Sequence, residues 1–130
     1  MAKLLDANLI IRFLLKDNLI QAAAVKKLLS ETTEDLIVTD LTIAEVVWVL
    51  QSVYKLPKQE VIEKVLSLLE INKLIVDYIL LTNSLLIYKD HHISFVDAYL
   101  AAYSEQNKLE GIYSFDKDLD KIKSVKRFKP

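Results

Sequence analysis

Short runs of β-type residues alternate along this chain with longer segments of helical periodicity, and this alternation limits its fold more than any other feature. The runs occupy residues 3–5, 36–38, 74–76, 111–114 and 125–128 of the 130-residue sequence. Strands that are separated by helices usually pair in a parallel sheet. The sequence therefore predicts an α/β fold built on five parallel strands.

The segments between these runs carry apolar residues at helical spacing. Before the second run, Ala22, Val25 and Leu29 predict one helix. Further helices are predicted at residues 43–50, 61–68 and 79–88 and from residue 94 onward. The chain has one glycine, Gly111, and two prolines, so it offers no linker-like stretch. We therefore expect a single domain that spans residues 1–130.

Composition excludes several classes of protein and of site. The chain has no cysteine, so it holds no disulfide, thiolate nucleophile or Cys-ligated zinc, and we expect a cytoplasmic location. With one glycine it cannot form a glycine-rich phosphate loop. Its 17 basic and 18 acidic residues give a net charge of −1, which offers no support for nucleic-acid binding through bulk charge.

No segment is long and apolar enough to cross a membrane. The longest mostly apolar stretch, residues 74–88, is shorter than the ~18 residues that a span needs, and it contains Asp77. Near the N-terminus, Asp6 and Arg12 interrupt the apolar stretch that a secretory signal requires. We therefore interpret the first residues as mature protein and expect no membrane association.

Two aspartates lie at the carboxyl ends of predicted strands. Asp6 comes after the first run and Asp116 after the fourth. If these strands are neighbours, their spacing of ~4.8 Å brings the two carboxylates close enough to share one cation. Ligands of open α/β sheets bind at this edge. The alternative is that each aspartate caps a turn or a helix, as aspartates after strands commonly do.

Two further acids lie in predicted helices. Thr42 with Glu45, and Ser94 with Asp97, match the capping-box pattern, so capping explains each acid without a function. Against capping alone, Asp97 is surrounded by apolar residues in the sequence, and a buried carboxylate must be paired or bound to metal. Glu45 shares a helical face with Trp48, which argues against a plain solvated face. Both interpretations stay open.

Together, the four acids and their flanks spell a family pattern. The segments are Leu-Leu-Asp-Ala-Asn at 4–8, Thr-Ile-Ala-Glu-Val at 42–46, Ser-Phe-Val-Asp-Ala at 94–98 and Ser-Phe-Asp-Lys-Asp at 114–118. This pattern resembles the PIN domain, in particular the VapC-like toxin ribonucleases, over the whole chain. The resemblance implies a three-layer α/β/α fold whose sheet has the order 3-2-1-4-5, which makes the first and fourth strands neighbours.

The resemblance also implies the residues of one acidic site. The catalytic residues are Asp6, Glu45, Asp97 and Asp116, of which Asp6, Asp97 and Asp116 are the metal ligands, with Asn8 and Ser114 supporting the ligands or the reacting water. Carboxylate oxygens suit Mg²⁺ or Mn²⁺ far better than zinc. Like-charge repulsion would raise some of their pKa values in the metal-free protein, so the cation is what lets all of them ionise.

The expected function is that of a Mg²⁺- or Mn²⁺-dependent ribonuclease, the toxin of a type II toxin–antitoxin pair. Its expected partners are RNA, a small antitoxin protein and a second copy of the chain, since VapC-like proteins are commonly dimers. The alternative is a non-catalytic or signalling α/β domain with an acidic Mg²⁺ pocket. A phosphoacceptor domain, however, needs a carboxylate pair after its first strand, where this sequence has Asp6 alone.

Other features have simpler interpretations. The segment 116–127 begins like a calcium loop but carries Lys121 and Arg127 where glycine and glutamate are required. The adjacent His91 and His92 favour a loop or helix-end role over metal ligation. The basic residues of 121–130 form either a solubilising edge and tail or a phosphate track for RNA. Trp48 is interpreted as a core residue, with a dimer contact as the alternative.

Overall fold

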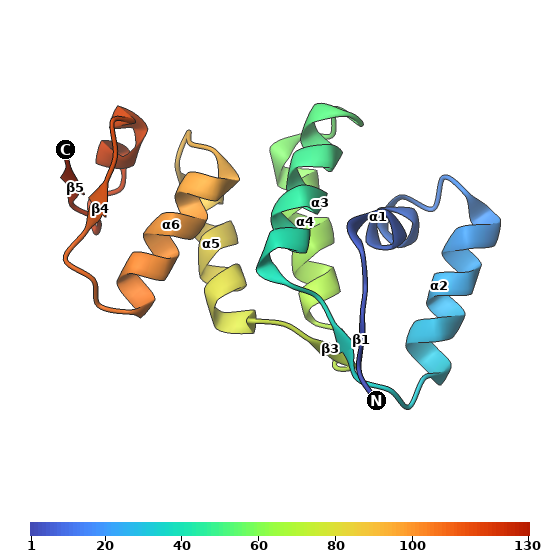
Figure 1. Ribbon diagram of the computed structural model, residues 1–130. Helices are drawn as coiled ribbons and strands as arrows, with labels where there is room; N and C mark the ends of the chain where they lie inside the picture. Colours follow the sequence, from blue (N-terminus) through green and yellow to red (C-terminus); the bar gives the residue numbers. More distant parts are fainter. The chain divides into compact units, whose positions relative to one another are not determined.

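The computed structural model describes residues 1–130, which divide into two compact units, Met1–Asp77 and Tyr78–Pro130. Three strands and four helices alternate along the first unit (Figure 1). They are β1 (Lys3–Leu4), α1 (Ala7–Leu15), α2 (Leu19–Glu31), β2 (Leu36–Ile37), α3 (Asp40–Ser52), α4 (Lys58–Leu69) and β3 (Leu74–Ile75).

The three strands of the first unit form one parallel sheet with β2 in the centre. Lys3 of β1 pairs with Leu36 of β2, and Leu36 pairs with Leu74 of β3. The backbone hydrogen bond from Leu5 N–H to the Ile37 carbonyl extends the β1–β2 pairing to the residue before Asp6. The pairing thus fixes the backbone up to Leu5, the residue before Asp6.

The core of the first unit is built from the inward faces of its helices. Ile43, Val46 and Leu50 of α3 are fully buried, and so are Val61 and Val65 of α4. These residues recur at spacings of three and four, as the sequence predicts for both helices. Burial of such side chains contributes roughly 1.5–3 kcal/mol each. The apolar stripes therefore hold α3, which begins at the carboxyl end of β2, and α4, which leads into β3.

The helix α1 was not among the predicted elements. Its buried residues Ala7, Ile10 and Ile11 recur at spacings of three and four, and the polar Asn8 and Arg12 lie on another face, so the segment does carry a helical stripe. Local signals also fix both of its ends. Asp6 caps the first turn, and Lys16 ends the helix in the left-handed conformation at φ 57°. Asn18 then caps α2, so two helices occupy the segment for which one was predicted.

The second unit contains two long helices, two strands and one turn of 3₁₀ helix. They are α5 (Tyr78–Asp90), α6 (Phe95–Gln106), β4 (Ile112–Tyr113), η1 (Lys117–Lys121) and β5 (Arg127–Phe128). β4 and β5 pair in parallel, with Ile112 opposite Arg127. All five predicted strands therefore form, each as a core of two residues within the predicted run.

The helices α5 and α6 pack side by side (Figure 1). Ala98, Ala101 and Ala102 of α6 are buried, so the two helix backbones can approach closely. At the turn between the helices, the rings of Tyr88 and Phe95 meet edge to face with centroids 5.8 Å apart. The small residues of α6 thus serve its contact with α5, and α6 also touches β4 and η1.

Gly111 stands where β4 begins to pair with β5. A Cβ atom at this position would overlap the carbonyl oxygen of Lys126 and lie 2.8 Å from the Phe128 ring. The Ile112 N–H donates to that same carbonyl at 2.9 Å. The only glycine of the chain is therefore required by the close approach of two backbones.

The structure confirms the α/β class and parts of the predicted strand order. The first sheet has the order β1-β2-β3 and the second is β4-β5, which agrees with both halves of the order 3-2-1-4-5. A continuous five-stranded sheet and a single domain over residues 1–130 stay predictions. The interpretation of Trp48 as a core residue is wrong, because its side chain is 62% exposed. No helix has the length and hydropathy that a membrane span requires.

Candidate metal centre

Asp97 lies in the first turn of α6. Ser94 is the N-cap of this helix, and its hydroxyl accepts a hydrogen bond from the Asp97 backbone N–H at 3.1 Å. This is the capping geometry that the sequence predicts for Ser94 and Asp97. The cap fixes the backbone at Asp97, and Ala98 beside it is fully buried. Asp97 is thus held on a rigid part of the fold, with its side chain half-buried.

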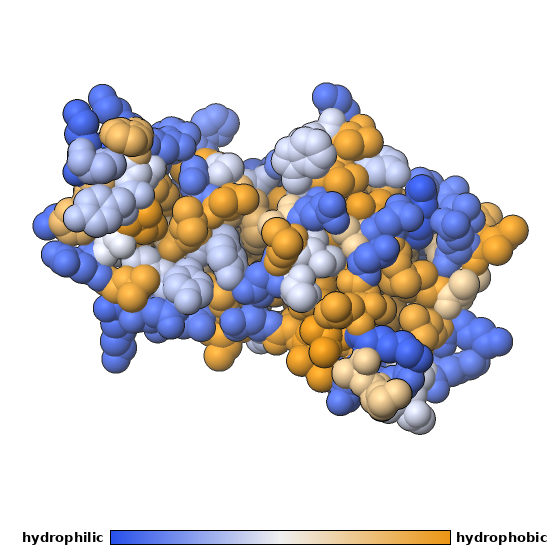
Figure 2. Space-filling model, in the orientation of Figure 1, coloured by the Kyte–Doolittle hydropathy of each residue, from blue (hydrophilic) through white to orange (hydrophobic).

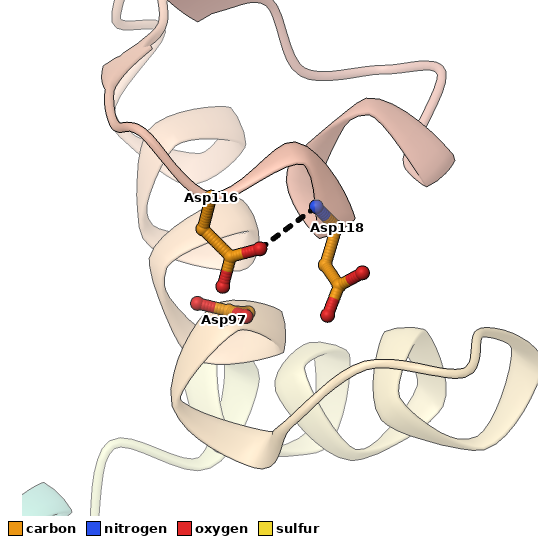
Figure 3. Close-up of side chains that lie close together, drawn as sticks. All are labelled: Asp97, Asp116 and Asp118. Atoms are coloured by element: carbon orange, nitrogen blue, oxygen red, sulfur yellow. Dashed lines mark hydrogen bonds between the residues drawn. The ribbon is translucent and has the colours of Figure 1, made fainter.

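Asp116 lies between β4 and η1, in a loop that its own side chain helps to fold. Its Oδ1 accepts a hydrogen bond from the Asp118 N–H at 2.9 Å and so caps η1 (Figure 3). The Ser114 hydroxyl accepts a hydrogen bond from the Asp116 N–H, also at 2.9 Å. Two successive side-chain turns therefore shape the loop. The capping interpretation of Asp116 is confirmed.

The Asp116 carboxylate does more than cap η1, because it also lies close to two other carboxylates. Asp97, Asp116 and Asp118 each place one carboxylate oxygen within 4.8 Å of the other two. Figure 3 shows these three side chains, which we call the acidic cluster, converging from α6 and from the start of η1. The helix and the 3₁₀ turn are in contact, and Leu119 of η1 is buried. Packing thus brings the three carboxylates together against their mutual repulsion.

The electrostatics of the acidic cluster are visible at Asp97. Partial burial raises the pKa of its carboxyl group, the charge of Asp116 raises it further, and Asp118 adds a smaller effect. The Ser94 hydroxyl opposes these effects by hydrogen bonding to the carboxylate. Because the pKa is raised, the folded chain disfavours the ionised form of Asp97. A cation among the three carboxylates would reverse this effect.

Two basic residues of the segment 121–130 make polar contacts with the loop that contains Asp116 and with η1. Arg127 binds the Asp120 carboxylate through Nε at 2.9 Å and Nη2 at 3.1 Å, and its Nη1 donates to the Ser114 carbonyl at 2.9 Å. Lys121 lies 3.1 Å from Asp118 and also donates to the His92 carbonyl. For Arg127 and Lys121, these contacts support the structural interpretation of the basic segment.

The donor set of the acidic cluster fits a hard divalent cation. Three carboxylates supply oxygen ligands alone, and neither His91 nor His92 belongs to the group. His91 instead bonds through Nδ1 to the Ile87 carbonyl at the end of α5, as expected for a helix-end residue. Mg²⁺ and Mn²⁺ prefer carboxylate oxygens, whereas zinc prefers nitrogen and sulfur. Asp97, Asp116 and Asp118 are therefore the residues that would hold such an ion.

The sequence was compared with models of known protein families. A family model of the PIN domain matches residues 3–125. The chain belongs to the PIN domain family. A search of the curated proteins finds no match. PIN domains are generally metal-dependent nucleases, so the family supports a nuclease and a divalent metal at the level of class.

Asp6 and Glu45, the other predicted acids of the PIN domain site, belong to the first unit. Asp6 is the N-cap of α1, and its Oδ1 accepts a hydrogen bond from the Leu9 N–H at 2.9 Å. Glu45 lies exposed on α3. Its assignment to a capping box with Thr42 is wrong, because Thr39 is the N-cap and accepts from the Thr42 N–H at 3.2 Å. Their participation in the site stays a prediction.

The two predicted supporting residues occupy different units of this PIN domain. Asn8 is exposed in the first turn of α1, two residues after Asp6. Ser114 supports Asp116 through the hydrogen bond described above and accepts from Arg127 through its carbonyl. Ser114 therefore has a defined structural role in the acidic loop.

Asp118 is the member of the acidic cluster that sequence reasoning missed. The sequence signal was present, because Asp116 and Asp118 are two residues apart and begin one residue after a predicted strand. The sequence prediction placed Asp118 in the family segment 114–118 and in a rejected calcium loop, and gave it no role in the site. A cap by Asp116 on the Asp118 N–H, with helical backbone beginning at Lys117, brings the second carboxylate beside the first. An Asp-x-Asp pair after a strand therefore indicates two converging acids as well as a calcium loop.

Proposed function

We propose that this PIN domain is a Mg²⁺- or Mn²⁺-dependent endoribonuclease that hydrolyses RNA phosphodiester bonds with an activated water molecule. The observation that carries the proposal is the convergence of Asp97, Asp116 and Asp118 from two separate elements. Three carboxylates held together at a cost in repulsion are characteristic of a metal site, whereas a capping role requires only one of them. Membership of the PIN family supplies the reaction class.

The complete site of the proposal includes Asp6 and Glu45. We propose that β1 and β4 are neighbours in one sheet of order 3-2-1-4-5 within a three-layer fold. β1 is an edge strand of the first sheet, and β4 pairs with β5 alone, which supports this order because each strand keeps one unpaired edge. At a strand spacing of ~4.8 Å, Asp6 and Asp116 would flank the same crevice.

The residues of the site have distinct tasks in this proposal. Asp97 and Asp116 are the principal ligands, with Asp6 the third and Asp118 beside them. Glu45 accepts a hydrogen bond from the attacking water, and Asn8 and Ser114 orient that water or the ligands. A bound Mg²⁺ or Mn²⁺ would lower the pKa of the reacting water molecule and stabilise negative charge on the phosphate. No side chain forms a covalent bond to the substrate.

We further propose that the protein is a cytoplasmic toxin that a small antitoxin neutralises. The motif flanks that resemble VapC-like toxins support this role. An arginine of the antitoxin, placed at the acidic cluster, would substitute for the cation electrostatically. Leu41 and Trp48, exposed by 80% and 62% on one face of α3, support a homodimer that buries them. Expression of the chain alone is expected to stop growth, and co-expression of the antitoxin to restore it.

A cleavage assay tests the nuclease proposal. The purified protein is incubated with a pool of single-stranded RNA in Mg²⁺, in Mn²⁺ and in EDTA, together with the variants Asp97→Asn and Asp35→Asn. Asp35 is an exposed aspartate outside the cluster, so its variant makes the same chemical change as a control. We expect cleavage with either metal by the unmodified protein and by Asp35→Asn, and none by Asp97→Asn.

The alternative, a non-catalytic or signalling domain, predicts a different result in the same assay. In that case no RNA is cut under any condition, although Mg²⁺ still binds. Full activity of a folded Asp97→Asn variant would remove Asp97 from the site.

A further inference from the structure

A cavity of about 260 Å³ lies between α1 and α2, within the first unit. Residues 8, 9 and 12 of α1 line one side of it, and residues 21, 24 and 25 of α2 line the other. These spacings of three and four place each set on one helical face, so the two helices face each other across the cavity. Asp6 lies at the end where α1 begins. We call this space the α1–α2 pocket.

The pocket has the size and the apolar wall of a site for one flat aromatic ring. Its volume of about 260 Å³ exceeds the ~150 Å³ of an enclosed apolar cavity that holds benzene, and because the pocket is open to solvent, polar substituents of a bound ring can stay in contact with water. Leu9, Ala24 and Val25 supply the apolar part of the lining. Val25 is buried and Leu9 is half-buried, so both side chains are held in place. A ring that enters the pocket would rest against them.

Two amide side chains at the pocket have unused hydrogen-bonding groups. The side chains of Asn8 and Gln21 are exposed, and neither makes a hydrogen bond within the chain. The backbone N–H of Gln21 donates to Asn18, which fixes the start of α2 and leaves the Gln21 amide group unused. An amide offers a donor and an acceptor side by side, which is the pattern that recognises the edge of a nucleobase.

Arg12 brings a positioned guanidinium group to the same pocket. Its Nη1 donates to Asp17 Oδ2 at 3.0 Å and to the Tyr54 hydroxyl at 3.3 Å, whereas Nη2 makes no hydrogen bond within the chain. The bond to Tyr54, and then the charge and the bond of Asp17, raise the pKa of Arg12. The group is therefore charged and held in orientation before any ligand arrives, which lowers the entropic cost of binding.

We propose that the α1–α2 pocket binds one nucleobase of single-stranded RNA next to the phosphate that is cut. The inference rests on the proposed ribonuclease function, because that proposal counts Asp6, which lines the pocket, among the catalytic acids. Gln21 recognises the polar edge of the base, and Arg12 donates from Nη2. Asn8 keeps its proposed task of orienting the water or the ligands, and because it also lines the pocket its amide reports when the pocket is occupied. The donor set favours a purine, because its N7 atom accepts hydrogen bonds both from amides and from guanidinium groups. Only an unpaired base presents its edge and faces in this way.

The base preference of cleavage tests the pocket. The variants Gln21→Leu and Gln59→Leu make the same chemical change, and Gln59 lies exposed on α4, outside the pocket. Sequencing of the fragments from a random RNA pool gives the base frequencies around each cut. We expect the unmodified protein and Gln59→Leu to prefer a purine at one position beside the cut. For Gln21→Leu, we expect the ratio of purines to pyrimidines at that position to fall by about fivefold or more.

An unchanged base profile for Gln21→Leu, at a melting temperature equal to that of Gln59→Leu, overturns the proposal. A binding measurement separates this failure from failure of the ribonuclease function. In EDTA, where the RNA stays intact, the side-chain amide signals of Asn8 and Gln21 are followed by NMR as ribotetranucleotides of A, G, C or U are added. We expect larger shifts with the purine tetramers.

RNA cleavage and the NMR response of the amide signals test the two proposals separately. If purine tetramers shift both amide signals but no RNA is ever cut, the pocket is supported and the hydrolytic function is wrong. If RNA is cut but neither amide signal responds to any tetramer, the function stands and the pocket proposal is wrong.

Discussion

The Asp116 carboxylate accepts a hydrogen bond from the backbone N–H of Asp118 at 2.9 Å while it also lies beside the carboxylates of Asp97 and Asp118. One side chain therefore stabilises the start of η1 and contributes negative charge to the acidic cluster. Because a cap requires a hydrogen-bond acceptor and a metal site requires charge, substitutions at this position can separate the two roles.

The first prediction compares two substitutions at Asp116 in metal-free protein. Asparagine caps about as well as aspartate, so Asp116→Asn removes charge repulsion and keeps the cap. We expect stabilisation by up to ~1 kcal/mol, or up to about 4 °C in melting temperature. Asp116→Ala loses the cap and is expected to cost ~0.5–2 kcal/mol. Thermal melts in EDTA measure both, and a destabilised Asp116→Asn would leave Asp116 with a structural role alone.

The second prediction concerns pH and Asp97. Since the pKa of Asp97 is raised in the folded protein, its contribution to stability is fully present below the unfolded value of 3.8 and is lost as pH rises through the folded value. The variant Asp97→Asn has no such loss. In EDTA, the difference in melting temperature between Asp97→Asn and the unmodified protein should therefore shift in favour of the variant between pH 3 and pH 7. A difference that is constant over this range would contradict the raised pKa.

The third prediction concerns metal binding without RNA. A cation that binds only the folded state stabilises it by RT ln(1 + [L]/Kd), or ~2.7 kcal/mol at a concentration of 100 Kd. Mg²⁺ or Mn²⁺ should raise the melting temperature of the unmodified protein and of Asp35→Asn. The increase should be much smaller for Asp97→Asn. Equal increases in all three proteins would mean that the cation binds elsewhere.

The fourth prediction tests the contact between β4 and β5. Gly111→Ala adds a methyl group where the Lys126 carbonyl and the Phe128 ring leave no room. We expect a loss of at least ~1–3 kcal/mol, the usual cost of overpacking, because the strand backbone would have to move. Urea denaturation measures the loss, with Gln106→Ala at the exposed end of α6 as a control. A Gly111→Ala variant as stable as the control would show that the strands can separate there at little cost.

The sequence predicts elements well where a local pattern has one interpretation. The apolar stripe of α4 and the small residues of α6 each predict a helix, and both helices form near the predicted ranges. The prediction missed α1, because its stripe of Ala7, Ile10 and Ile11 follows the first predicted strand so closely that the two apolar runs merge in the sequence. There the informative signals were Asp6 and Asn18, two caps that begin consecutive helices.

The acidic cluster was predictable only in part for a related reason. Asp97 and Asp116 follow recognisable patterns, a capping box and a strand end. Asp118 joins them through a hydrogen bond between its own backbone and a neighbouring side chain, which no apolar periodicity records. Strand order depends on contacts between distant segments, so local patterns predict that the strands exist but carry little information about which of them pair.

The contacts of Arg127 connect the stability of the last strand to the acidic loop. This side chain holds both Asp120 and the carbonyl of Ser114, and Ser114 in turn holds the backbone of Asp116. β5 pairs with β4 over only two residue pairs, and such short pairings open more readily than the packed core. When β5 separates from β4, Arg127 would lose its bonds to Asp120 and to Ser114 together. The carboxylates of the acidic cluster would then be held less firmly, although Arg127 bonds to none of them. A protein that binds over β5 would therefore change the affinity of the proposed metal site without touching its carboxylates.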